Sequence, residues 1–225
     1  MKTLQVTLWL YTMALSKSWD CVRKNWVVSL APVAYGIILT LAGVVAGPLG
    51  IVGGLVYSLV SSACASSGLY LVKNMVESGK TDINDFLNGF LVYLGDLITF
   101  FFILWLPMWA AANLLGGVPN GWLVYLLLRL GLFVLLNAVP EMISQGRVSG
   151  LELIGASYSF IVENWIEWLV PNLILFAAGY FFLDFFASLL FGLPAIVQLF
   201  VAALVLGLLL AYYMTFRGFL FSQLH

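Results

Sequence analysis

The sequence predicts an all-α integral membrane protein with six transmembrane helices in three hairpins, together with interfacial amphipathic helices. The first observation is composition: 63% of the 225 residues are hydrophobic and only 8% are charged, whereas soluble domains carry about 25% charged residues. The second is that apolar stretches long enough to span a bilayer are separated by short turns. These observations exclude a soluble enzyme, a disordered tail and a disulfide scaffold. The apolar stretches lack the ten-residue alternation of barrel strands.

Residues 1–24 form the first expected element, a helix that lies in the membrane interface. Its apolar run, Leu4–Leu15, is too short to cross a bilayer and is followed by basic residues. A signal peptide cleaved near the small residues Ala14 and Ser16 is one alternative. A seventh span is the other.

Six apolar stretches of spanning length follow, and we treat residues 1–225 as a single polytopic membrane domain. Glycine and proline turns without any charge join these stretches in pairs. The expected spans are residues 26–46, 50–73, 87–115, 122–143, 164–190 and 195–216. A second interfacial helix is expected at residues 150–163.

The distribution of charge predicts the orientation of the spans. Basic residues precede the first span, and the longer connections carry Lys73, Lys80 and Arg147. Arg217 follows the last span. Because basic residues favour the cytoplasmic side, we expect both termini and both long connections to be cytoplasmic.

A weak internal repeat appears when the chain is shifted by 139 residues. Residues 18–32 then align with residues 157–171, and Asn25-Trp26 coincides with Asn164-Trp165. We expect each copy to be an interfacial helix that breaks at its asparagine, with the tryptophan in the aromatic belt. Four spans separate the copies, so a parallel repeat would have its axis along the membrane normal. The alternative is that two interfacial helices use the same common boundary residues independently.

The pattern Ser-Trp-x-x-Val-x-x-Asn-Trp at residues 18–26, the Gly47-Pro48 turn and the segment 85–90 resemble a loosely defined bacterial group. The group comprises uncharacterised six-span inner-membrane proteins, similar to YciC-like proteins and to the membrane domain fused to some glycerophosphodiester phosphodiesterases. The resemblance implies a multi-pass protein of the bacterial inner membrane. It does not extend to a phosphodiesterase catalytic domain, so it implies no such activity.

A stripe of small residues follows one face of the second span at four-residue spacing. Small residues let helices approach closely, and serine hydroxyls can bond across the contact. We interpret the stripe as a packing face within this chain. A contact with another subunit and the lining of a polar path are the alternatives. The stripe consists of Gly50, Gly54, Ser58, Ser62 and Ser66.

Three charged residues lie within the expected spans and away from the span ends, where charges are costly and face protein or water. Arg129 and Asp184 are expected at nearly the same depth, and Asp96 lies nearer the cytoplasmic side. We predict an intramembrane ion pair of Arg129 with Asp184, with Asp96 as the second choice of partner. A site that couples protons to transport is the alternative.

No catalytic, cofactor-binding or metal-binding set can be assembled from the sequence, so we expect a protein that is not an enzyme and holds no cofactor. The only histidine is His225, and Cys21 and Cys64 match no metal motif. Walker, HExxH and GxSxG motifs are absent. Nine basic against ten acidic residues leave no basic surface for nucleic acid.

Two functions from different classes remain. The first is a non-catalytic scaffold or accessory subunit that contacts the lipid bilayer and a partner membrane protein, or a second copy of itself. Lys17, Arg23 and Lys24 would contact anionic lipids. The second is a small-molecule or vitamin transport component, similar to the substrate-binding subunits of energy-coupling-factor transporters. An enclosed cavity with converging polar groups would favour transport, and a filled bundle with a broad apolar flank would favour the scaffold.

Overall fold

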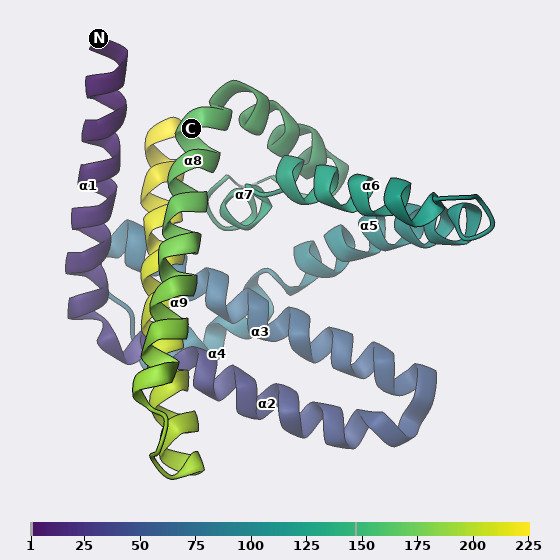
Figure 1. Ribbon diagram of the computed structural model, residues 1–225, viewed down its shortest axis with the longest axis horizontal. Helices are drawn as coiled ribbons and strands as arrows, with labels where there is room; N and C mark the ends of the chain where they lie inside the picture. Colours follow the sequence, from purple (N-terminus) through teal and green to yellow (C-terminus); the bar gives the residue numbers. More distant parts are fainter. Residues whose placement is uncertain (1, 147) are drawn as a thin grey trace.

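The computed structural model describes residues 2–146 and 148–225, and every regular element in these residues is helical (Figure 1). Arg147, one of the residues used to predict the orientation, lies outside them. The elements are α1 (Lys2–Lys24), the 3₁₀ helix η1 (Trp26–Leu30), α2 (Ala31–Ala46), the 3₁₀ helix η2 (Gly47–Leu49), α3 (Gly50–Ser78), α4 (Ile83–Val92), α5 (Leu94–Leu115), α6 (Gly121–Leu135), α7 (Val139–Gln145), α8 (Leu151–Leu189) and α9 (Ala195–Leu224).

Five helical stretches of the described residues are long and apolar enough to cross a membrane. The predicted all-helical, multi-pass membrane character is therefore confirmed. The stretches are Trp26–Ser78, Leu94–Leu115, Gly121–Gln145, Leu151–Leu189 and Ala195–Leu224.

The first of these stretches is 53 residues long and folds back on itself at η2. Near the turn, Gly53 packs so closely on the backbone of Ala46 that no Cβ atom would fit. Farther along the hairpin, the Tyr35 hydroxyl donates a 2.8 Å hydrogen bond to Ser67 Oγ. The turn itself uses a left-handed backbone at Gly50, with φ of +57°, which glycine adopts without strain. Helices α2 and α3 are thus antiparallel neighbours.

Two predicted spans are interrupted in the structure. The stretch 87–115 breaks at Tyr93 into α4 and α5, and the stretch 122–143 breaks near Asn137 into α6 and α7. At the first break, the Tyr93 N–H donates a 2.8 Å hydrogen bond to Ser66 Oγ of α3. A neighbouring helix therefore satisfies the freed backbone group, as a low-dielectric environment requires.

Helix α1 packs along α9 with one face (Figure 1). Its buried residues Ala14, Ser18, Cys21 and Val22 recur at the three- and four-residue spacing of a helix face. The Cys21 thiol donates to the Met75 carbonyl oxygen of α3 at 3.1 Å. Helix α1 therefore belongs to a packed base, which also contains α4, α7 and the first part of α8.

Three hairpins diverge from this base: α2–α3, α5–α6 and the pair formed by the second part of α8 and α9 (Figure 1). Their divergence leaves much of the molecule uncovered. The accessible surface is 13811 Å², whereas a compact soluble chain of this mass would expose about 10,200 Å². The hairpins are in contact near the base and separate toward their tips.

The two asparagine corners have the same local geometry. Asn25 has φ −114° and ψ 36°, and Asn164 has φ −121° and ψ 25°. In each, Nδ2 donates to the carbonyl oxygen four residues earlier, at 2.9 Å and 3.1 Å respectively. Trp26 and Trp165, which follow them, are both exposed. The chain continues differently after each corner, because η1 follows Asn25 whereas α8 continues as one kinked helix past Asn164.

Candidate functional site

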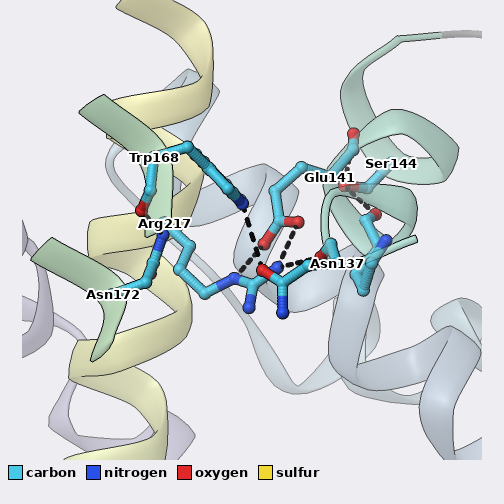
Figure 2. A network of polar contacts seen from close by, with 7 residues as sticks. Asn137, Glu141, Ser144, Trp168, Asn172 and Arg217 are labelled. Carbon is cyan, nitrogen blue, oxygen red and sulfur yellow. Dashed lines mark hydrogen bonds and ion pairs between the residues drawn. The ribbon is translucent and has the colours of Figure 1, made fainter. Parts of the chain in front are cut away.

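A buried ion pair between Arg217 and Glu141 lies where α9, α8 and α7 meet (Figure 2). Arg217 Nε donates a 2.7 Å hydrogen bond to Glu141 Oε1, and the terminal nitrogen Nη2 donates a 2.7 Å hydrogen bond to Glu141 Oε2. The same terminal nitrogen also donates to the Asn137 carbonyl oxygen at 2.5 Å. Both side chains of the pair are almost fully buried. This fork geometry gives each buried charge a partner.

Trp168 joins this cluster from α8 (Figure 2). Its Nε1 donates a 3.0 Å hydrogen bond to Asn137 Oδ1, and its ring lies 5.1 Å from the Arg217 guanidinium carbon. Asn172 Nδ2 donates to the Trp168 carbonyl oxygen at 2.7 Å. We call Asn137, Glu141, Trp168, Asn172 and Arg217 the polar cluster. Its charges and most of its polar atoms are engaged with one another, and the cluster contains no nucleophile beside a base.

A cavity of about 1060 Å³ lies between the diverging hairpins, and Asn137 and Arg217 of the polar cluster form part of its wall. Most of the lining side chains are aliphatic or aromatic. They come from several helices, for example Leu39 of α2, Leu104 of α5, Phe133 of α6 and Phe176 of α8. The cavity can therefore accept an apolar body.

Arg129 of α6 lines the same cavity. No ion pair joins it to Asp184 or Asp96 within 4.0 Å, although the structure describes all three residues. The predicted pair is thus not formed. Arg129 and Asp184 are both exposed, because the hairpins that carry them diverge.

The small-residue stripe divides into two parts. Ser62 and Ser66 are buried, whereas Gly50, Gly54 and Ser58 are exposed toward the tip of the hairpin. Ser66 Oγ donates to the Gly89 carbonyl oxygen of α4 at 2.6 Å. The stripe therefore packs against α4 only over its lower part, and the close contact with α2 is made by Gly53 instead of Gly54.

The predicted lipid contacts Lys17, Arg23 and Lys24 are exposed on α1. The Lys17 ammonium lies 5.9 Å from the centre of the Phe219 ring. Cys21 lies on the buried side of α1, where burial raises the pKa of its thiol above its usual range. The basic side chains are thus exposed beside the buried face of α1, while the cysteine is held in the fold.

Sequence reasoning missed the polar cluster. Arg217 was expected only to follow the last span, and Glu141, Asn137 and Trp168 were given no role. A signal was present, because two opposite charges at the same end of two apolar stretches can neutralise each other. The Pro140-Glu141 dipeptide also falls inside the predicted span 122–143.

No family model, no curated protein and no solved structure matches this chain.

Proposed function

We propose that the protein is a non-catalytic, multi-pass subunit of the bacterial inner membrane that holds lipid and a partner membrane protein between its hairpins. One observation carries this proposal: the three hairpins diverge from a packed base and leave an apolar cavity of about 1060 Å³. Apolar surface of this kind favours contact with lipid chains or with helices of another protein. Anionic lipids would bind at Lys17, Arg23 and Lys24.

In the proposed topology the chain crosses the membrane six times, with both termini on the cytoplasmic side. The spans are α2, α3, α4–α5, α6–α7, the second part of α8, and α9. This arrangement puts the uncharged turns at one side and the polar base at the other. It also places α1 and the first part of α8 at the cytoplasmic interface.

We further propose that the chain contains a parallel duplication. The matching geometry of the Asn25 and Asn164 corners supports it. The same offset of 139 residues also relates the end of α3 to the end of α9. The identical residues there are Gly68 and Gly207, Leu69 and Leu208, Leu71 and Leu210, Met75 and Met214, and Gly79 and Gly218.

A transport component is the second candidate, and the cavity itself is the observation that favours it. Cavities that hold small molecules have volumes of about 300–1000 Å³ and a few converging polar groups. Here the polar groups of Arg217, Glu141 and Asn137 bind one another, so they are not free to orient a polar substrate. This favours the scaffold.

The experiment is extraction from native membranes in a lipid-bounded polymer disc, followed by mass spectrometry of proteins, lipids and small molecules. A scaffold should bring down a stoichiometric membrane protein, absent from discs of an unrelated multi-pass protein prepared in parallel. A water-soluble small molecule at one per chain would instead support transport. Discs with only bulk lipid and no companion protein would contradict the scaffold.

A further inference from the structure

We propose that Arg129 and the cavity form a binding site for an anionic lipid, with the lipid phosphate at Arg129 and an acyl chain between the hairpins. This inference rests on the proposed function, because it names the lipid class that the hairpins hold. It concerns a site separate from Lys17, Arg23 and Lys24 on α1.

The charge of the cavity wall leads to this proposal. Only two of the lining residues are charged, Arg129 and Arg217. Arg217 is neutralised by Glu141 through two 2.7 Å hydrogen bonds. Arg129 has no ion pair and no hydrogen-bonded side-chain partner within the part of the chain that the structure describes. The wall therefore carries one uncompensated positive charge.

The position of Arg129 along α6 makes its unpaired charge energetically unfavourable. It lies eight residues into α6, which begins at Gly121, or about 12 Å along the helix axis. In the proposed topology this is the outer half of the bilayer, where an unpaired arginine is costly. A phosphate offers oxygens that match the fork of the guanidinium and removes that cost. An anion at this place therefore stabilises the protein.

The apolar side chains of the cavity wall indicate which chemical group is attached to the anion. The surrounding side chains include Leu39, Leu104, Met108, Phe133 and Phe176. These offer little to a free phosphate ion, which keeps its hydration shell in water. An acyl chain gains about 0.8 kcal/mol for each methylene group it buries. An amphiphile with one anionic group satisfies both parts of the site.

Most polar side chains of the lining already have partners within the protein. The Tyr213 ring lies 5.6 Å from the Arg217 guanidinium carbon. The Tyr35 hydroxyl donates to Ser67 Oγ at 2.8 Å, and Ser61 Oγ donates to the Ser58 carbonyl oxygen at 2.9 Å. Asn137 is engaged in the polar cluster. Arg129 is thus the group that selects the anion.

The test uses the full-length protein in discs of phosphatidylcholine with a small fraction of phosphatidylglycerol, and native mass spectrometry counts the bound lipids. The variant K17Q/R23Q/K24Q serves as background, so that the predicted interfacial contacts do not contribute. In this background R129L should lower phosphatidylglycerol binding at least tenfold, whereas R129K should retain most of it. The matched control K80L removes one exposed cation away from the cavity and should change nothing.

A second variant tests the apolar part and does not rely on Arg129. Ala65 lines the cavity, so A65W should displace the acyl chain and lower lipid binding with Arg129 intact. Cys64 is also in the lining, although it is largely buried, and in a protein with Cys21 replaced by serine it provides a second readout. Phosphatidylglycerol should slow its labelling by a lipophilic maleimide in the background protein but not in the R129L protein.

Equal phosphatidylglycerol binding by R129L and its background would overturn the proposal. Binding of inorganic phosphate at Arg129 without any preference for the lipid would also overturn it. A third contrary outcome is that a partner protein occupies the cavity, so that A65W releases this protein and leaves lipid binding unchanged. The same measurements test the proposed scaffold function independently of the lipid site. A companion protein retained by R129L supports the scaffold even when the lipid site fails, and lipid selectivity without any companion supports only the lipid site.

Discussion

Arg217 and Glu141 illustrate how a charged residue is tolerated in the interior of this fold. Each side chain is buried, and each finds its charge partner on another helix through a pair of hydrogen bonds. The cation also lies over the Trp168 ring at 5.1 Å, which adds a favourable electrostatic contact. The pair therefore links α7, α8 and α9 at one point.

Breaking this pair should destabilise the protein strongly. Removing one partner of a buried ion pair costs about 3–5 kcal/mol, because the other charge is left without compensation. We expect Arg217→Met alone to lower the melting temperature in detergent more than Arg217→Met/Glu141→Leu does. Differential scanning fluorimetry measures both. Additive losses in the double variant would show that the two charges do not depend on each other.

At the level of single residues, the sequence identified charges but not their partners. Arg129 was expected to pair with Asp184 because both lie within apolar stretches at similar depth. The pairing depends on which helix faces meet, and that is decided by packing between distant segments. Arg217 and Glu141 are 76 positions apart in the chain, so no local pattern connects them.

Among the helices, α3 and α4 make a close contact at Gly89. A Cβ atom on Gly89 would lie 2.9 Å from the Ser67 Cα atom. Ser67 Oγ donates to the Phe86 carbonyl oxygen at 2.8 Å, so the two helices are joined by hydrogen bonds at the same place. Small residues and serine hydroxyls together produce this close packing.

Gly89→Ala should therefore destabilise the protein by about 1–3 kcal/mol, since the backbones must move apart. The matched control is Gly95→Ala on α5, where a Cβ atom would meet no atom within 4 Å. There the change should be neutral or stabilising, because alanine favours helix by about 1 kcal/mol over glycine. Thermal unfolding of the two variants decides the matter. Equal effects would mean that α3 and α4 are not in close contact.

The two asparagine corners should differ in strength although their geometry is alike. Asn25 also donates to the Gly79 carbonyl oxygen at 2.9 Å and accepts from the Thr81 N–H at 3.0 Å. Among the described residues, the Asn164 side chain makes one hydrogen bond, the local one to the Phe160 carbonyl oxygen. Each buried hydrogen bond contributes about 0.5–1.5 kcal/mol.

We accordingly expect Asn25→Ala to lower the melting temperature more than Asn164→Ala. Each substitution serves as the control for the other, because the local backbone geometry is the same. A larger loss at Asn164 would indicate that the second corner is held by contacts outside this chain.

Much of the element order was predictable because glycine and proline turns act locally. The turn at Gly47–Leu49 joins two helices as predicted. The breaks at Tyr93 and near Asn137 were not predicted, since apolar residues continue through both. A hydrogen bond with another helix accompanies each break: the Tyr93 N–H donates to Ser66 Oγ at the first, and Arg217 donates to the Asn137 carbonyl oxygen at the second.

For the whole molecule, the charge pattern and the arrangement of the hairpins lead to one prediction about orientation. In a protein with Cys21 and Cys64 replaced by serine, a cysteine at Val118 should react with a membrane-impermeant maleimide from outside the cell. A cysteine at Ser149 should react only after the membrane is permeabilised. Labelling intact and permeabilised cells tests this, and the reverse pattern would contradict the six-span topology.

The contact between α1 and α9 has a consequence for biosynthesis. Helix α1 packs on α9, far along the chain, so the base cannot close until α9 has left the ribosome. At about 5–20 residues per second, the roughly 200 residues between them take about 10–40 s to translate. During that time the buried face of α1, which includes Ala14 and Val22, has no α9 to cover it. The bilayer surface is the apolar phase within reach of a nascent membrane protein, so α1 should lie there and dock only after α9 has been synthesised.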